Sequence, residues 1–276
     1  MSEASNDLNR ETREAWEMNA EVWDNRMADD GNDFFNILCW PALASFLTAS
    51  TTLSTSLKPD SHILDIACGN GLTTRRLAEL GAQVTAFDFS SNLIEKAKVR
   101  TARYASSITY HVIDATDESQ LLSLGEGKYD SALSNMALFD MANIETLFQT
   151  LPKLLKPNGT FIFSITHPAF NNASSAHVVE ETDDHGEMKI VYSIKVSRYM
   201  TPHHQRGLAL HNQPKPQVYF ERPLQYYLNL CFKNGFVLDG FEERAFPPET
   251  PQSHPLGWGG KFSELPAVIV ARMRLV

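Results

Sequence analysis

Cysteine is scarce in this sequence of 276 residues. Its three cysteines, Cys39, Cys68 and Cys231, are far apart and odd in number, so they indicate neither a disulfide framework nor a zinc site. A reducing, cytoplasmic setting is the simpler interpretation. Basic residues are also few, because 24 Lys and Arg face 33 Asp and Glu and the formal net charge is −9. This balance argues against a general nucleic-acid binder, since phosphate backbones favour basic surfaces.

Long apolar runs are missing as well. The first 13 residues are polar and acidic, and they lack the apolar core of a signal peptide. The most apolar stretch, 34–49, is short and interrupted by polar residues, so it predicts a buried helix rather than a membrane span. We therefore expect no membrane association. With 43% hydrophobic residues, the chain is long enough for one large domain, or one domain with an insertion.

An alternation of strands and helices fills the middle of the chain. Helices are predicted at 8–28 and 34–49, followed by a polar linker at 50–61. The expected strands are 62–67, 82–88, 107–113, 129–135 and 160–166, and the expected helices between them are 71–80, 91–103 (capped by Ser90 or Ser91), 117–124 and 142–155. This order predicts a parallel sheet covered on both faces, with the carboxyl ends of its strands at one edge.

The alternation of strands and helices stops after residue 166. Residues 188–198 alternate as a strand of a small inserted sheet, for which 217–221 is the candidate partner. Helix 223–234 and strands 236–244 and 267–275 then resume the main fold. The expected organisation is an N-terminal helical cap (1–58), a core (59–166), an inserted lid or substrate segment (167–222) and the C-terminal part of the core (223–276).

A glycine-rich turn, 65–71, stands where the first strand meets its helix. Gly69 and Gly71 allow the backbone to approach a ligand without a Cβ in the way. A turn of this kind at the carboxyl edge of a parallel sheet is often a nucleotide-binding element. By itself it is a weak signal, because many turns contain two glycines.

Three aspartates strengthen the signal, because each stands at the end of a successive strand. Asp88 can accept hydrogen bonds from both hydroxyls of a ribose, and Asp114 can lie at an adenine edge. Asp65 can order the loop and contact the amino group of a bound amino acid. The alternative for each aspartate is that it only caps the helix that follows.

The turn departs from two common nucleotide-binding motifs. A dinucleotide fingerprint needs glycine or alanine at position 74, where this chain has Thr74. A phosphate-binding loop would need a Gly-Lys-Ser/Thr sequence, and none follows the turn.

At this point the chain resembles the class I S-adenosylmethionine (SAM)-dependent methyltransferases, in particular their small-molecule, type 11-like group. The resemblance covers 60–166 and, less closely, 222–276. The segments that carry it are Leu-Asp-Ile-Ala-Cys-Gly-Asn-Gly (64–71), Ala-Phe-Asp-Phe-Ser (86–90), Val-Ile-Asp-Ala-Thr (112–116), Ser-Asn-Met-Ala-Leu (134–138), Leu-Lys-Pro-Asn-Gly-Thr (155–160) and the helix-to-strand segment 222–236.

The resemblance implies an α/β fold with a Rossmann-like, doubly wound sheet of seven strands, mostly parallel, whose last strand is antiparallel. It implies SAM as cofactor and S-adenosylhomocysteine as product. No metal is expected, because the cysteines do not form a zinc site. The residues expected to bind the cofactor are Trp23, Asp65, Ala67, Gly69, Asn70, Gly71, Asp88, Phe89, Asp114, Ala115, Thr116, Asn135 and Met136. Two positions depart from the family pattern. Trp23 replaces a usual tyrosine, which removes any hydroxyl contact to the cofactor carboxylate, and Ala67 replaces a common glycine.

Catalytic residues are harder to predict, because methyl transfer from a sulfonium mainly needs a positioned nucleophile. His167, at the end of the fifth strand, is a candidate base, and the alternative is a histidine that binds backbone. Asp140 is a second candidate, with capping of helix 142–155 as the alternative. Residues that could form an acceptor pocket are Phe34, Trp40, Phe139, Tyr192 and Tyr219, although such aromatics are more often part of a core.

These observations predict an enzyme (EC 2.1.1.-) that methylates a small or medium-sized metabolite on oxygen or nitrogen, as a monomer or homodimer. The N-terminal helices and the 167–222 insert would exclude water from the reaction. Two alternatives stay open: a SAM-binding enzyme of this fold with another reaction, such as cyclisation, and a non-catalytic SAM-binding partner protein. A pocket filled by Trp40 or Phe139 would favour the second.

Overall fold

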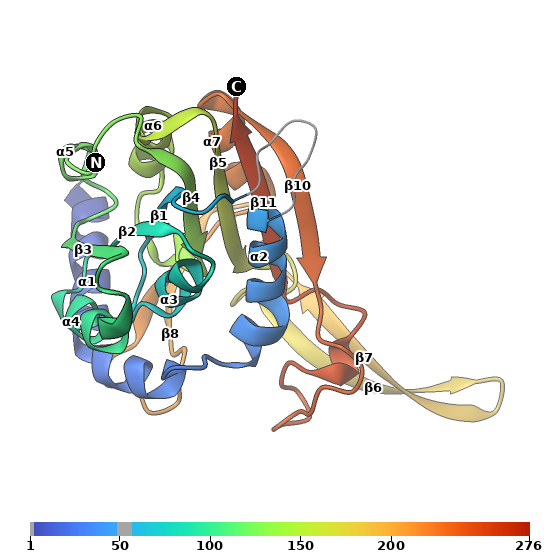
Figure 1. Ribbon diagram of the computed structural model, residues 1–276. Helices are drawn as coiled ribbons and strands as arrows, with labels where there is room; N and C mark the ends of the chain where they lie inside the picture. Colours follow the sequence, from blue (N-terminus) through green and yellow to red (C-terminus); the bar gives the residue numbers. More distant parts are fainter. Residues whose placement is uncertain (1–2, 49–56) are drawn as a thin grey trace.

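A seven-stranded sheet forms the centre of the computed structural model, which describes residues 3–48 and 57–276 (Figure 1). Its strand order is β3-β2-β1-β4-β5-β11-β10. The first five strands are parallel, and β11 runs antiparallel to both β5 and β10. This topology confirms the expected fold class. The strands are β1 (His62–Ile66), β2 (Gln83–Asp88), β3 (Ile108–Val112), β4 (Tyr129–Asn135), β5 (Leu155–Thr166), β10 (Phe236–Arg244) and β11 (Val268–Leu275).

Helices cover both faces of the sheet (Figure 1). One face packs against a π-helical segment, η1 (Phe34–Cys39), and helices α2 (Trp40–Thr48), α3 (Leu72–Glu79) and α4 (Ser91–Arg100). The other face packs against α5 (Glu118–Leu122), α6 (Glu145–Leu154) and α7 (Leu224–Lys233). The long helix α1 (Glu3–Met27) lies beside α4, and short 3₁₀ turns are η2 (Ala102–Tyr104), η3 (Leu138–Asp140) and η4 (Gly260–Phe262).

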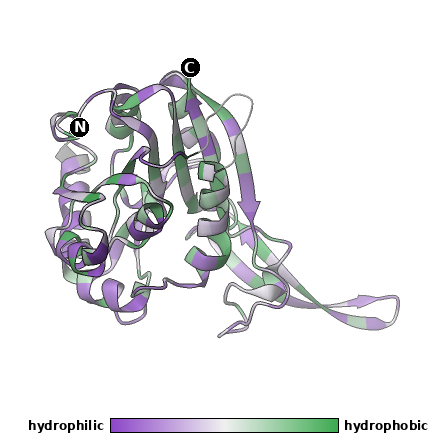
Figure 2. Cartoon of the chain, viewed as in Figure 1, coloured by the Kyte–Doolittle hydropathy of each residue, from purple (hydrophilic) through white to green (hydrophobic). Residues whose placement is uncertain are grey.

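The apolar pattern of β5 explains how one strand serves two cores. Phe161 and Phe163 are fully buried against the α6 and α7 side, whereas Ile162 is buried on the α2 side. Successive strand residues point to opposite faces, so a strand covered on both sides must be apolar throughout. Figure 2 shows this concentration of hydrophobic residues in the sheet and on the inner sides of the helices.

The structure shows which of the predicted caps and turns are formed. Ser90, not Ser91, caps α4, because its side chain accepts a hydrogen bond from the Leu93 amide at 3.2 Å. The break expected at 156–159 is a bulge at the start of β5, where Asn158 has a positive φ of 61°. The expected linker at 50–61 lies largely outside the described residues.

The insert after β5 contains two separate antiparallel pairs. Strand β6 (Ser175–Asp184) pairs with β7 (Glu187–Val196), and the resulting hairpin projects from the body of the molecule (Figure 1). Strand β8 (His203–Gly207) pairs with β9 (Gln217–Glu221). A strand near 188–198 is therefore confirmed, but its predicted pairing with 217–221 is wrong. Strand β7 pairs instead with β6, which directly precedes it. Pairing across this short turn closes a smaller loop than pairing with 217–221 would, so it costs less chain entropy.

In residues 3–48 and 57–276, no helix is long and apolar enough to cross a membrane.

Candidate active site

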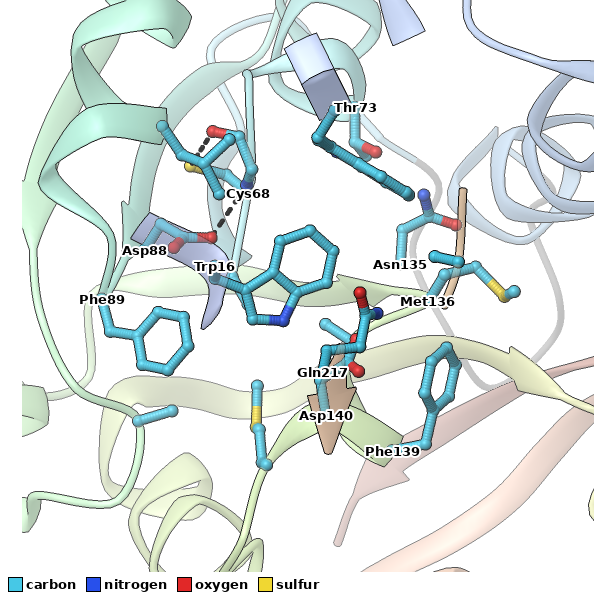
Figure 3. Close-up of a pocket in the computed structure, with 18 of the residues that line it drawn as sticks. Trp16, Cys68, Thr73, Asp88, Phe89, Asn135, Met136, Phe139, Asp140 and Gln217 are labelled. Atoms are coloured by element: carbon cyan, nitrogen blue, oxygen red, sulfur yellow. Dashed lines mark hydrogen bonds between the residues drawn. The ribbon is translucent and has the colours of Figure 1, made fainter. Parts of the chain in front are cut away.

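A cavity of about 520 Å³ lies at the carboxyl edge of β1, β2, β3 and β4. This volume falls in the range of about 300–1,000 Å³ that is typical of small-molecule sites. Its walls come from the glycine-rich turn, the strand ends, α1 and the insert (Figure 3). All of the residues expected to bind the cofactor line it, except Gly71.

The glycine-rich turn is closed by a buried hydrogen bond. The Thr74 hydroxyl on α3 donates to Asp65 Oδ2 at 2.6 Å. Burial raises the pKa of the Asp65 carboxyl to about 7, the Thr74 hydrogen bond opposes this, and the Asp88 charge adds to it. Thr74, the residue that departs from the dinucleotide motif, therefore ties the strand end to the helix.

The two glycines of the turn have different roles. Gly69 lines the cavity, and its amide donates to Asp88 Oδ2 at 3.0 Å. Gly71, which was also expected to contact the cofactor, does not line the cavity. It has a φ of 78°, and a Cβ there would lie 2.6 Å from the Tyr110 hydroxyl and 3.0 Å from Ala97 Cβ. Gly71 allows the turn to pack closely against its neighbours.

Asp88 ends β2 with both carboxylate oxygens already held by backbone. Oδ2 accepts from the Gly69 amide at 3.0 Å and Oδ1 from the Ser90 amide at 2.9 Å. Each oxygen keeps a further lone pair for a ligand. Burial raises the pKa of this carboxyl to about 6, although the Ser90 and Gly69 amides oppose the shift. The Asp88 carboxylate is thus held rigidly in the cavity wall, and it can accept hydrogen bonds from two hydroxyl groups.

Asp114 lies two residues after the end of the adjacent strand, β3, where the N-terminal helix covers it. Its Oδ1 accepts from the Thr116 amide at 2.8 Å, and its Oδ2 accepts from Asn9 at 2.8 Å and from Arg13 at 3.1 Å. The sequence did not indicate the two partners on α1, because they lie more than 100 residues away. Asn9 itself lines the cavity.

Helix α1 is also anchored to the glycine-rich turn. Asp24 accepts from Asn70 at 3.0 Å and from the Arg100 guanidinium on α4, with one contact at 3.0 Å. Burial alone would raise the pKa of Asp24, but the hydrogen bonds from Arg100 and Asn70 lower it overall. On the same helix, the indoles of Trp16 and Trp23 pack edge to face at 5.1 Å, and both line the cavity.

The far end of the cavity is walled by the turn after β4. Ser164 donates to Asn135 Oδ1 at 2.7 Å, and Met136 follows with a strained φ of 55°. Phe139 and Asp140 come next, on η3. Like Asn135 and Met136, they line the cavity (Figure 3). Asp140 does not cap α6, which starts at Glu145 after Ile144, so that alternative is wrong.

Asp140 is a buried acid with an unpartnered oxygen. It is 8% exposed, and its Oδ1 has no hydrogen-bond partner among the described residues. Burial raises the pKa of Asp140 well above its usual range, while a hydrogen bond from Gln217 opposes the rise. Figure 3 shows the two side chains next to one another, beneath the Trp16 indole.

Strand β9 supplies cavity residues that sequence reasoning largely missed. Gln217, Tyr219 and Glu221 line the cavity, whereas Val218 is fully buried on the opposite side. Only Tyr219 was predicted. Its ring lies 6.1 Å from that of Phe139. The period of two along this strand was the available signal, because it places all three residues on one face.

Two predicted acceptor residues lie elsewhere. Trp40 stacks on Phe35, with ring centroids 5.9 Å apart, and it is absent from the cavity lining. Tyr192 on β7 packs edge to face on Phe262 at 5.5 Å, so it anchors the projecting hairpin. Phe34 does line the cavity, and it also packs against Phe246. Aromatic character alone did not distinguish cavity residues from core residues.

His167 is also outside the cavity lining, and its ring nitrogens are engaged. Nδ1 accepts from the amides of Ala169 (3.1 Å) and Phe170 (3.3 Å). Nε2 is then the protonated nitrogen and donates to Glu243 at 2.9 Å. Burial lowers the pKa of His167, and Glu243 opposes this. These contacts favour the alternative to a base, a histidine that fixes a turn.

The charge of the cavity suits a cationic ligand. Its described lining contains five acids and no lysine, arginine or histidine. These acids are Asp65, Asp88, Asp114, Asp140 and Glu221. SAM carries a sulfonium and an ammonium group, so these acidic acceptors match a nucleoside with positive charge on its tail.

Comparisons with known proteins agree with this site. Residues 64–163 match a family model described as a methyltransferase domain, and they form a methyltransferase domain of the class I SAM-dependent kind. A ubiquinone biosynthesis O-methyltransferase from Xanthomonas campestris is 30% identical over 106 residues, which are 38% of this chain and 43% of that protein. One from Caulobacter vibrioides is 39% identical over 97 residues, 35% of this chain and 37% of that protein. The chain thus spans less than half the length of these relatives.

Solved structures show the same fold over most of the chain. A SAM-dependent methyltransferase from Mesorhizobium loti has a TM-score of 0.61 and 23% identity, over 85% of this chain and 96% of that one. A putative one from Listeria monocytogenes has a TM-score of 0.59 and 22% identity, over 80% and 94% respectively. At these identities the likeness extends to the fold alone.

Proposed function

We propose that this protein transfers the methyl group of SAM to a small or medium-sized metabolite. The observation that carries the proposal is the cavity itself. It brings the ends of β1, β2 and β3, which suit a nucleoside, into one space with Phe34, Phe139 and Tyr219, which can wall an apolar acceptor. SAM, when bound, supplies an electrophilic methyl group on sulfur.

The chain's own residues would hold and orient the two reactants. Asp88 would accept the ribose hydroxyls, and the backbone beside Asp114 to Thr116 would meet the adenine. Asp65 and Asn135, which line the same cavity, would contact the amino-acid tail. Since transfer needs an in-line approach, orientation by these rigid groups is the main contribution of the protein.

Two covers would exclude water from the site. Helix α1 bridges the core and the insert, because Glu11 pairs with Arg206 at 2.7 Å and the Lys215 carbonyl accepts from Asn19 at 2.7 Å. We propose that α1, within 1–58, and the 167–222 segment act as a lid around a core made of 59–166 and 223–276. The β6–β7 hairpin contributes no described residue to the lining, so the lid is formed by the remainder of the insert.

The three cysteines are free and buried, which supports the proposed reducing, cytoplasmic setting. Of the two alternatives, a non-catalytic partner protein loses its support, because Trp40 packs outside the cavity and Phe139 leaves it open.

Labelled methyl transfer tests the proposal. The full chain is incubated with SAM carrying a tritiated methyl group and a metabolite extract of the source organism. The expected result is a labelled product together with S-adenosylhomocysteine. A protein that binds SAM and converts a metabolite without label transfer would belong to the alternative class of enzymes, such as cyclases, and would contradict the proposal.

A further inference from the structure

The acceptor end of the cavity contains two acids that the cofactor rim does not use. Asp140 stands on η3, and Glu221 stands on β9, which packs against η3. Of the rim acids, Asp114 is already paired with Arg13 at 3.1 Å. No lysine, arginine or histidine among the described lining residues faces Asp140 and Glu221.

Arg222 fixes the turn that contains Asp140 without forming an ion pair with its carboxyl group. The guanidinium of Arg222 donates to the carbonyls of Leu138 (3.2 Å), Met141 (2.8 Å) and Ala142 (3.1 Å), which fixes the turn around Asp140. The Arg222 guanidinium thus binds backbone oxygens and not the Asp140 carboxyl. Asp140 Oδ1 has no hydrogen-bond partner among the described residues. A buried, unpaired acceptor is costly unless a ligand supplies the missing donor.

Glu221 is the second acid and is only partly satisfied. Its Oε1 accepts from the Ala173 amide at 3.2 Å and from Gln205 at 3.3 Å. Tyr219 and Phe139 line the same cavity as the two acids, with ring centroids 6.1 Å apart. Aromatic faces attract cations, so the acids and the rings favour the same kind of ligand.

We propose that the methyl acceptor is an amine with an apolar body, which enters as an ammonium ion and is bound by Asp140 and Glu221. The inference rests on the proposed function and names its substrate class. A phenolate or carboxylate acceptor would instead face two acids, with no lysine, arginine or histidine among the described lining residues to bind it. A neutral alcohol could supply a hydrogen bond to Asp140 but no positive charge to either acid.

The proposed step balances in protons and electrons. The ammonium gives one proton to the Asp140 carboxylate, which leaves a neutral amine with a free electron pair. That pair forms the N–C bond to the methyl group as the C–S bond breaks, and the pair of the broken bond stays on sulfur. The product is a methylated ammonium ion, and Asp140 returns its proton to solvent when the product leaves. Burial, which raises the pKa of Asp140, suits it to hold this proton.

The experiment separates a metabolite extract by ion exchange into cationic, neutral and anionic fractions. Each is incubated with the full chain and SAM labelled in its methyl group. We expect label to enter the cationic fraction, and carbon-13 NMR of the product to show a methyl group on nitrogen. A product methylated on oxygen, sulfur or carbon, or label confined to the other fractions, would overturn the inference and leave the proposed function standing.

Variants test the role of Asp140 with the acceptor so found. Asp140→Asn should raise the KM for that acceptor at least tenfold and leave the Kd for S-adenosylhomocysteine within twofold. Glu181→Gln, which removes an exposed acid on β6, should change neither constant. If Asp140→Asn does not fold, Glu221→Gln takes its place. An unchanged acceptor KM in the folded variant refutes the inference. Calorimetric binding of SAM with no label in any fraction would contradict the proposed function, and the inference with it.

Discussion

Two cavity residues have backbone conformations that side chains rarely adopt. Ala67 follows β1 with a φ of 53°, and Met136 follows β4 with a φ of 55°. Strain of this kind persists where the surrounding structure imposes it, often at functional sites. The common glycine that Ala67 replaces therefore has a physical explanation, since glycine adopts this conformation without a steric penalty.

Ala67→Gly should stabilise the protein by about 0.5–1 kcal/mol, because relief of the left-handed strain exceeds the entropy gained by the unfolded chain. Ala137→Gly is the matched control, since Ala137 also lines the cavity but has a φ of −127°. It should lose about 0.5–1 kcal/mol. Urea unfolding measures both. Equal losses in the two variants would refute the strain argument.

Asp88→Asn should weaken SAM binding by about 2 kcal/mol or more, because charge-assisted hydrogen bonds to the ribose are lost. The folded carboxyl has a pKa of about 6, and only its ionised form accepts both hydroxyls. SAM affinity of the wild type should therefore fall as the pH falls through about 6. Calorimetry between pH 5 and 8 measures this. A variant that keeps the same pH dependence would show that another group is responsible.

At the level of elements, the sequence predicts the sheet well and the insert poorly. Strands β4 and β10 have the predicted bounds, because apolar runs between turn signals mark buried strands strongly. In the insert, alternation identifies β7 but not its partner, since a period of two says nothing about register or neighbour. The π-helical start of the 34–49 segment also has no signal in the pattern.

His167→Ala is a test of the turn at the start of the insert. The side chain accepts two backbone amides and donates to Glu243, so its loss should destabilise the protein by about 1–2 kcal/mol. The rate of label transfer should stay within about threefold at saturating SAM. Unfolding and transfer assays measure the two effects. A rate that collapses while stability is kept would restore His167 as the base.

Asp24→Asn probes the attachment of helix α1. Asp24 and Asp29 both pair with Arg100, but the Asp24 side chain is 10% exposed and that of Asp29 is 72% exposed. The buried partner should matter more, with a loss of about 2 kcal/mol against less than about 0.5 kcal/mol for Asp29→Asn. Urea unfolding at pH 7 compares them.

The pH dependence of the Asp24 effect has a definite sign. Its folded pKa is lowered below the usual 3.8, so the stabilisation is present above that pH and is lost as the pH falls below it. The difference between wild type and Asp24→Asn should therefore shrink on acidification. A difference that grows in acid would contradict the assigned ion pair.

At the scale of the whole molecule, the site is assembled from distant segments. Asp65, Asp88 and Asp114 could be predicted because parallel strands bring their ends to one edge. Trp16 from α1 could not, because the position of a helix depends on tertiary packing. The alternation along β9 groups Glu221 with Tyr219 on one face, but it does not show that this face lines the cavity. The same limit explains why Tyr192 and Trp40 were misplaced.

Calorimetric titration of the full chain with SAM at pH 7.5 tests the central claim most directly. We expect saturable binding at one site per chain, weakened by about 2 kcal/mol or more in Asp88→Asn. Absence of binding by the wild-type protein, or equal binding by the variant, would contradict it.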